Sequence, residues 1–323
     1  MKGNLIGVFG TNPELKTTFE TSFVKKNEVE GIVIYSRTEG DTKYSYLDDV
    51  SYPEKIQGYA RIASISDYAY YIFPRDGKLT AADGELAVLM DAFSLKGSIQ
   101  LIDAQATSFQ DLIRGTFKDV SVSSYPVEER SSRSSLLPSN KPAESRPWPS
   151  SGTLIYIDRA FNVKGVGIVV LGFVLCGRVA VHDELRLVPG SQEKFAEVRG
   201  IQVNDEDQEL VESGIRVGLS LKGIELKDLA KTSWLDDGTF KLGRRFSFEF
   251  RQSKYYRQAT VDRDLHVQLN GELLVARISE GPSSISRMAE FQQDVPFWDG
   301  MKIGLIDLNS KPLRVIGGGD VLA

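Results

Sequence analysis

The stretch IDRAFNVKGVGIVVLGFVLCGRVAVHDELRLVP spans residues 157–189 and carries the clearest structural pattern in the 323-residue chain. Short runs rich in β-branched and aliphatic residues are separated by glycines, namely Gly165, Gly167, Gly172 and Gly177. Glycine at a strand end permits positive φ angles and tight corners. The pattern therefore predicts a small closed or sandwiched β domain that turns at its glycines.

The same β pattern continues along the chain on both sides of this stretch. Runs such as TLIYI, FAEVRGIQV and IRVGLSL, separated by Gly, Asp and Asn, predict a first β-barrel domain at residues 151–237. A second set of β runs starts near residue 240, after SWLDDG, and predicts another β-barrel domain at residues 238–323. Residues 127–150 contain seven serines and four prolines. Such a segment buries too little apolar surface to fold alone, so we expect an exposed linker.

The first part of the chain, residues 1–126, has a different pattern. Its strand-like runs are LIGVFG, YAYYIF and SIQLID, and its helix-like runs are LKTTFETSFVKK, GELAVLMDAFSLKG and FQDLIRGTFKD. Strands that alternate with helices favour parallel βαβ units. The expected fold class is therefore multidomain α/β + β, with an α/β domain followed by two β-barrel domains.

Composition excludes several classes of function. Cys176 is the only cysteine and the chain has two histidines, His182 and His266, so a structural zinc site is excluded. An internal disulfide is impossible, which together with the lack of a secretory pattern fits a reducing cytoplasm. No run approaches 18 apolar residues, so we expect no membrane partner. The net charge of −5 means that nucleic acid would have to meet a local basic face.

Residues 157–189 resemble a known family through many ordered matches. The matching residues are the run 157–161 (IDRAF), then Val163, Lys164, Gly165, Gly167, Val169, Val170, Gly172, Gly177, Asp183 and Glu184, followed by the segments 199–207 and 214–229. They resemble the second domain of translational GTPases such as elongation factor Tu, and most closely that of the selenocysteine-specific elongation factor SelB. A generic small barrel that turns at glycines is the plain alternative. The resemblance implies an archaeal SelB-like paralogue with a P-loop NTPase-like G domain before its two β-barrel domains.

The segment GTNPELKTT nearly matches a phosphate-binding loop, G-x-x-x-x-G-K-[ST]. It follows a strand-like run and opens a helix-like one, and it comprises Gly10, Thr11, Asn12, Pro13, Glu14, Leu15, Lys16, Thr17 and Thr18. Leu15 stands where the second glycine belongs, which weakens phosphate binding if that position needs positive φ. Alone, the motif is as consistent with coincidence as with a site. With the resemblance, it is interpreted as a decayed nucleotide loop that binds GTP or GDP weakly, with Mg²⁺ held by Thr17 and Asp48.

The remaining family motifs for GTP hydrolysis are degenerate. Val33, in GIVI, would stand where the family's switch I has a threonine that binds Mg²⁺. Tyr52 would replace the switch II histidine that positions water, and Ser51 the glycine before it. The base-recognition motif N-K-x-D should follow SIQLID, where residues 103–106 read DAQA. SVSSY (121–125) is either a faint remnant of the last base-contacting loop or a polar strand end. Whether the chain is an enzyme thus stays open, and any hydrolysis is expected to be poor.

The barrels of the family carry aminoacyl-tRNA, with the aminoacyl end against the second domain. Candidates for tRNA contact here are Arg199, Asn204 and Asp205, although Asn204 stands where SelB proteins typically have histidine. Solvated barrel loops are the alternative reading. The basic and aromatic run at 244–258 adds Arg251, Lys254 and Arg257, which can follow a phosphate backbone or form the outer face of two strands.

Two functions follow from these observations. The first is a SelB/EF-Tu-like elongation factor that binds aminoacyl-tRNA and, weakly, GTP or GDP, with the ribosome as a further partner. The second is a non-catalytic regulatory or scaffold protein that kept the fold and lost nucleotide control. In either case we expect a cytoplasmic monomer, and no constellation of residues indicates an independent metabolic enzyme.

Overall fold

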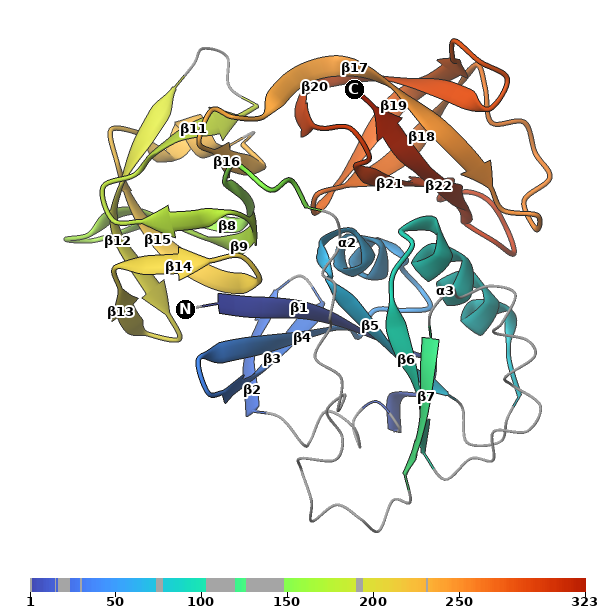
Figure 1. Cartoon of the computed structure of the whole chain (residues 1–323), viewed down its shortest axis with the longest axis horizontal. Coiled ribbons are helices and arrows are strands. Elements are labelled where there is room, and N and C mark those ends of the chain that lie inside the picture. The colour runs from blue at the N-terminus through green and yellow to red at the C-terminus, as the bar shows by residue number, and fades with distance from the viewer. Residues whose placement is uncertain are drawn as a thin grey trace.

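The computed structural model describes residues 2–14, 16, 24–29, 31–73, 78–102, 120–125, 148–189, 194–230 and 232–323. An α/β part (residues 2–125) comes first and two β-barrel domains follow it, all three packed together (Figure 1). The helix predicted for FQDLIRGTFKD and most of the predicted linker lie outside the described residues.

The α/β part is built on a seven-stranded sheet in the order β2-β3-β4-β1-β5-β6-β7. Its strands are β1 (Lys2–Phe9), β2 (Val24–Val29), β3 (Ile32–Glu39), β4 (Thr42–Asp49), β5 (Tyr68–Phe73), β6 (Gly97–Ile102) and β7 (Val120–Tyr125). Strands β4, β1, β5, β6 and β7 are parallel, as the βαβ pattern predicts. Helices α2 (Gln57–Ile65) and α3 (Ala81–Ala92) lie between this sheet and the second barrel (Figure 1).

The edge of this sheet corrects one expectation. LKTTFETSFVKK was predicted to be helical as far as Lys26, but residues 24–29 form β2, which pairs antiparallel with β3. Strand β3 in turn pairs with β4 across the turn at residues 40–41. Pairing along this meander overrides the local helical spacing, because an edge strand gains ladder hydrogen bonds that helical periodicity does not anticipate.

The first barrel, called barrel II here, spans residues 153–237. Its elements are β8 (Leu154–Val163), β9 (Gly167–Cys176), β10 (Arg178–Ala180), β11 (Glu184–Val188), β12 (Phe195–Val203), β13 (Glu206–Gln208), β14 (Leu210–Glu212), β15 (Ile215–Lys222), the short helix η3 (Leu226–Leu229) and β16 (Trp234–Asp236). Pairing of β11 with both β16 and β12 closes the barrel. Gly177 adopts φ +71, and a Cβ there would lie 2.3 Å from the carbonyl oxygen of Gly152. This corner therefore requires glycine, as its place at a strand end predicts.

The second barrel, called barrel III here, is closed in the order β17-β20-β19-β18-β21-β22. Its strands are β17 (Lys241–Gln252), β18 (Arg263–Leu269), β19 (Glu272–Glu280), β20 (Ser286–Phe297), β21 (Lys302–Ile306) and β22 (Val315–Leu322). Phe246, Phe291 and Phe297 pack ring against ring in its interior.

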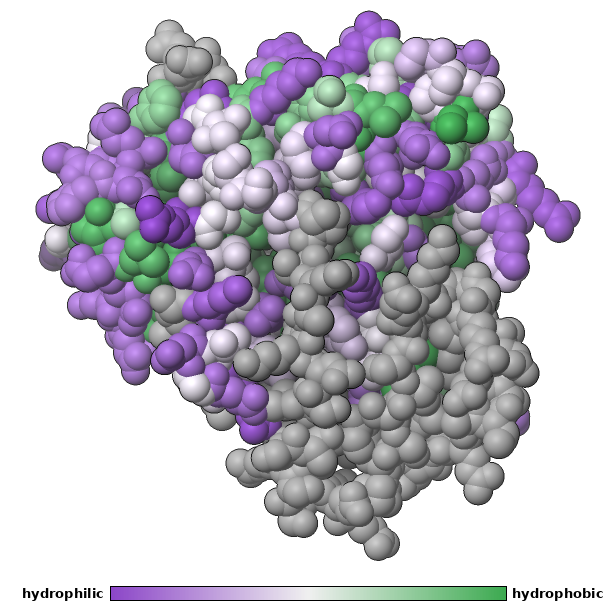
Figure 2. Space-filling model, viewed as in Figure 1, coloured by the Kyte–Doolittle hydropathy of each residue, from purple (hydrophilic) through white to green (hydrophobic). Residues whose placement is uncertain are grey.

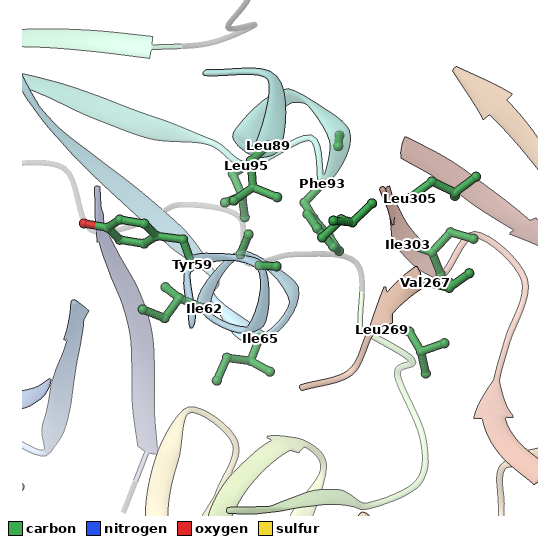
Figure 3. Packing of buried hydrophobic residues seen from close by; sticks show 14 of the residues in the cluster. Tyr59, Ile62, Ile65, Leu89, Phe93, Leu95, Val267, Leu269, Ile303 and Leu305 are labelled. Atoms are coloured by element: carbon green, nitrogen blue, oxygen red, sulfur yellow. The ribbon is translucent and has the colours of Figure 1, made fainter. Parts of the chain in front are cut away.

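One continuous hydrophobic core joins the α/β part to barrel III. In Figure 3, Phe93 after α3 points toward β18 and β21, whereas Tyr59 and Ile62 of α2 point away from barrel III. The labelled residues of this core are Tyr59, Ile62, Ile65, Leu89, Phe93, Leu95, Val267, Leu269, Ile303 and Leu305. The buried hydroxyl of Ser64 accepts hydrogen bonds from the Gln268 side chain (3.0 Å) and the Gly271 backbone (2.9 Å). These two hydrogen bonds join α2 to barrel III and help to fix how the helix docks.

Barrel II is held to both neighbours. The indole N–H of Trp234 donates to the carbonyl of Asn270 in barrel III at 2.8 Å, and Gly3 N–H donates to Ser213 O at 3.0 Å. Trp148 was expected to be exposed with the linker, yet it donates to Asp67 (3.1 Å) and its ring lies 5.8 Å from that of Trp298. The end of the linker is therefore anchored between the α/β part and barrel III, because an indole buries more apolar area than its polar neighbours.

Candidate functional site

The end of β1 leads into the loop predicted to bind phosphate. Gly10 follows the strand, and a helical turn begins at Pro13 and Glu14, with Lys16 N–H donating to Asn12 O at 3.1 Å. The strand-loop-helix context is therefore present. Leu15, Thr17 and Thr18 lie outside the described residues, so the structure does not place the predicted Mg²⁺ ligand Thr17.

Other residues of this loop contact α3. Thr11 donates from its hydroxyl to Asp83 Oδ1 at 2.6 Å, and Tyr71 donates to the same oxygen at 2.6 Å. Asp83 also closes a capping box with Thr80 at the start of α3. Burial and the neighbouring Asp83 carboxylate raise the pKa of Tyr71 well above its ordinary value. Thr11 is thus part of a hydrogen-bond network that anchors the helix.

Lys16 is buried and paired with Asp48, the residue predicted to bind Mg²⁺. The ammonium nitrogen lies 2.8 Å from Asp48 Oδ1, and the two side chains are 8% and 2% exposed. It also lies 3.0 Å from the Tyr59 hydroxyl and 3.4 Å from the carbonyl oxygen of Asp49. Tyr59 in turn donates to Asp48 Oδ1 at 2.7 Å. We call these three side chains, Lys16, Asp48 and Tyr59, the Lys16 cluster. In this cluster the predicted site residues Lys16 and Asp48 contact each other, whereas the sequence predicted a phosphate beside Lys16 and Mg²⁺ on Asp48.

The turn after β4 holds Ser51 and Tyr52, the residues that the sequence resemblance aligns with switch II. Asp49 accepts from the Ser51 backbone (2.8 Å) and hydroxyl (2.6 Å), and burial raises the pKa of Asp49. Tyr52 donates its hydroxyl to Ala82 O at 2.7 Å. Burial, followed by the charge of Glu85, raises the pKa of Tyr52 well above its ordinary value. The Tyr52 hydroxyl is thus held inside the protein as a donor to backbone.

Barrel III reaches across to this turn through Arg314. Its guanidinium contacts both carboxylate oxygens of Glu85 and donates to Pro53 O (3.0 Å) and Glu54 O (3.1 Å). The cation also lies 5.8 Å from the centre of the Tyr52 ring. Because Glu85 is 3% exposed, this is a largely buried ion pair between two parts of the chain. We call the contact the Arg314 clamp. No pattern in the sequence singles out Arg314 or Glu85.

Val33, predicted to stand in switch I, is a buried residue of strand β3. It lies opposite Asp48 in the β3–β4 ladder and opposite Glu28 in the β2–β3 ladder. The backbone of this segment is therefore paired with strands on both sides, and the Val33 side chain has no oxygen that could bind a metal. Within the described part of the chain, no group of three or more His, Cys, Asp or Glu side chains could hold a metal ion. SVSSY forms β7, and the DAQA segment lies outside the described residues.

A cavity of about 540 Å³ lies between the sheet of the α/β part and barrel II. The sheet contributes Ser36, Lys43 and Ser45, all buried, from β3 and β4. The barrel contributes the β8–β9 hairpin, the β12–β13 turn and part of β15. The cavity combines apolar walls with polar groups, which is the usual form of a small-ligand site.

Two of the predicted tRNA-contacting residues line this cavity. Asn204 and Asp205 form the β12–β13 turn at its edge, with φ of +53 and +67. Arg216 lies deeper and is held by Asp158 through two hydrogen bonds of 2.7 and 3.0 Å. Arg199 is exposed on β12 and does not line the cavity. The sequence missed Lys43, Ser45 and Arg216, because no local pattern shows which strand face will meet barrel II.

The remaining candidates lie on barrel III. Arg251, at the end of β17, pairs with Asp320 at 2.8 Å and keeps 41% of its side chain exposed. Lys254 lies over the exposed Tyr255 ring at 5.1 Å, and Arg257 is also exposed. Strand β13 and the far end of β17 are on opposite sides of the molecule (Figure 1). In Figure 2 the visible outer surface of both barrels is mainly hydrophilic, with apolar residues scattered among polar ones.

Comparison with known proteins shows which of them this chain resembles. Residues 167–235 match the family model for elongation factor Tu domain 2. The chain is 26% identical, over 99% of both chains, to an uncharacterized protein of Methanocaldococcus jannaschii. It is also 40% identical to the selenocysteine-specific elongation factor of that organism, over 27% of this chain and 18% of that protein.

Solved structures share the whole arrangement. SelB from Methanococcus maripaludis in complex with a GTP analogue superimposes with a TM-score of 0.77 at 19% identity, covering 100% of this chain and 79% of SelB. A bacterial selenocysteine-specific elongation factor gives 0.80 at 15% identity, covering 99% of this chain and 58% of that protein. The chain thus shares with these elongation factors the fold of an α/β part and two barrels. Within it, residues 167–235 are similar to domain 2 of elongation factor Tu and to the matching segment of the selenocysteine-specific elongation factors.

Proposed function

We propose that this chain is a SelB/EF-Tu-like translation factor that carries aminoacyl-tRNA, with the aminoacyl end in the cavity between β3–β4 and barrel II. The observation that carries the proposal is the cavity itself. Its barrel wall, including Val169 and Gly218, comes from the segment that matches elongation factor Tu domain 2. Its volume of about 540 Å³ is in the range of small-ligand pockets. Apolar walls with Lys43 and Arg216 at depth can take an amino acid and part of a terminal nucleotide.

The tRNA stems would lie along the barrels. Arg199, Arg251, Lys254 and Arg257 are exposed and can each neutralise a phosphate. Because the chain as a whole carries a net charge of −5, this attraction is local and sensitive to salt. The ribosome is a further proposed partner, and the carrier would act as a monomer. No helix in the described part of the chain is long and apolar enough to cross a membrane.

GTP or GDP binding is proposed to be weak and hydrolysis poor. The described residues do not form a ready phosphate site, because the Lys16 ammonium is already bound to Asp48, Tyr59 and Asp49. A nucleotide with Mg²⁺ on Thr17 and Asp48 would first have to separate Asp48 from Lys16. Tyr52, which replaces the water-positioning histidine, donates to a backbone carbonyl instead.

A cavity-blocking substitution tests the carrier function. Val166 lines the cavity and is 46% exposed, so Val166→Trp fills space without disturbing a core. We expect the wild type to bind mixed aminoacyl-tRNA and slow hydrolysis of its ester bond, and the variant to bind at least about tenfold more weakly. Gel shift and ester-protection assays with acylated and deacylated tRNA measure both effects.

Ile285→Trp is the matched control, since Ile285 is 59% exposed on barrel III and away from the cavity. It should bind as the wild type does. Equal binding of acylated and deacylated tRNA, unaffected by Val166→Trp, would contradict the proposal. Absence of tRNA binding altogether would favour the second candidate, a regulatory or scaffold protein. The observation behind that candidate is the Arg314 clamp, which holds the switch II turn in one place.

A further inference from the structure

We propose that the carboxylate of Asp48 takes the place of a nucleotide phosphate at Lys16, so that the chain holds its three-part arrangement without any nucleotide. The inference goes beyond the carrier function, because it concerns what occupies the phosphate position rather than what the barrels bind. It stands on the hydrogen bonds and burial of the Lys16 cluster and on the way the following turn is fastened.

The ammonium of Lys16 has no donor left for a phosphate. An ammonium has three N–H groups, and three acceptors surround it: Asp48 Oδ1, the Tyr59 hydroxyl and Asp49 O. The carboxylate supplies the negative charge that a phosphate oxygen would supply. A phosphate that approached Lys16 would meet this carboxylate at close range, and two anions that share one site repel each other.

The surroundings of the cluster hold Asp48 in this position. Tyr59 projects from α2, is fully buried, and lies 3.3 Å from Gly10 O as well as 2.7 Å from Asp48. Its neighbour Gly58 lets α2 approach, since a Cβ there would lie 2.3 Å from Asp49 Oδ2. The hydroxyl thus joins the phosphate-loop backbone, the end of β4 and α2. Pulling Asp48 away from Lys16 would leave buried charge unpaired, which is strongly unfavourable.

The turn after Asp48 is fastened at its other side by barrel III. Arg314 donates to Pro53 O and Glu54 O and pairs with Glu85, and Tyr52 donates to Ala82 O. A ligand moves a protein between two states only if it binds them differently. Here both ends of the turn are held by the chain's own charges. Among the described residues, the contacts that hold this turn come from the chain itself, so we expect a phosphate to change them little.

Removing the charge of Asp48 tests the inference. If Asp48 substitutes for phosphate, Asp48→Asn leaves Lys16 without a carboxylate partner and should bind inorganic pyrophosphate at least about tenfold more tightly than the wild type. If Asp48 were instead an Mg²⁺ ligand, the same change would weaken binding of Mg²⁺–GDP. The two roles predict opposite signs. Titration calorimetry with pyrophosphate in EDTA and with Mg²⁺–GDP reads both.

Two further variants complete the experiment. Asp236→Asn removes the carboxylate of another buried pair, Arg186–Asp236 in barrel II, and should lower the unfolding temperature without changing pyrophosphate affinity. Tyr59→Phe keeps both charges and loosens the cluster, so it should show a smaller gain and remains informative if Asp48→Asn does not fold. Submicromolar GDP binding by the wild type, or no gain in either cluster variant, would overturn the inference. Neither result bears on tRNA binding, so the carrier function is judged separately.

Discussion

Lys16 and Asp48 are of the residue types that the family uses at its nucleotide site, but their contacts differ from that use. The ammonium and the carboxylate are 2.8 Å apart and nearly inaccessible, whereas a phosphate-binding lysine must keep a donor available. The loop motif stays a prediction of a nucleotide site, and the structure adds that Lys16 and Asp48 contact each other. Whether a nucleotide displaces Asp48 stays a prediction, for which the opposite signs expected of Asp48→Asn are the direct test.

Cys176 gives an independent prediction for a single residue. Burial raises the pKa of its thiol to about 12, against 9.0 for an ordinary thiol. At pH 8 the thiolate is then rarer in the folded chain than in the unfolded chain by a factor of about a thousand, so iodoacetamide should label the folded protein at least about a hundredfold more slowly. Because the folded pKa is raised, the free energy of unfolding is unaffected below the ordinary pKa and falls as pH rises from about 9 towards 12. Equal labelling rates with and without urea would show that the thiol is accessible.

At the scale of elements, the docking of α3 on barrel III depends on glycine. A Cβ at Gly318 in β22 would lie 2.0 Å from Ala92 O, the last carbonyl of the helix, and a Cβ at Gly304 in β21 would lie 2.7 Å from the Phe93 ring. Two positions on the adjacent strands β21 and β22 must therefore be glycine so that the C-terminal end of α3 can pack against them. Their sequence context, GGGD and KIGL, shows only that glycine is present in a strand.

Two glycine-to-alanine changes, one at this contact and one on the exposed face of α3, should have opposite effects on stability. Gly318→Ala inserts a methyl group against backbone and should lower the free energy of unfolding by about 1–3 kcal/mol. Gly84→Ala, in α3, meets nothing within 4 Å and should raise it by about 0.5–1 kcal/mol, because alanine favours helix. Urea unfolding followed by circular dichroism measures both. If Gly318→Ala proved neutral, α3 and β22 could not be packed as closely as described.

At the scale of the whole molecule, the three parts share one core and several long-range ion pairs and hydrogen bonds. The Arg314–Glu85 pair joins residues 229 apart in sequence, and the Gln268–Ser64 hydrogen bond joins residues 204 apart. In a switching protein such contacts would have to break when the nucleotide changes. Here the Arg314 contacts hold the turn that follows Asp48, and the Gln268–Ser64 hydrogen bond holds α2, the helix after that turn. The arrangement therefore favours one state.

Scattering should show this single state. We expect the same radius of gyration for the empty protein, with GDP and with a GTP analogue, and tRNA affinities that agree within about twofold among the three. Small-angle scattering and gel shift measure these quantities, with an intact family member measured alongside as the positive control. A clear change in radius between GDP and the GTP analogue, seen in this chain, would mean that its switches still respond.

The sequence by itself determined the β-rich second half, the two barrels and the likeness to the translational GTPases. Glycines at strand ends and β-branched runs act locally, so they can be read without knowing which parts meet; Gly177, at its tight corner, is the example. Only the tertiary structure decided what Lys16, Lys43 and Arg314 contact. Lys43 faces barrel II across a cavity, and Arg314 meets a carboxylate from a helix of the α/β part. The physical reason is that a charge is paired by whatever docking brings within a few ångströms of it, and docking depends on surfaces assembled from residues hundreds of positions apart.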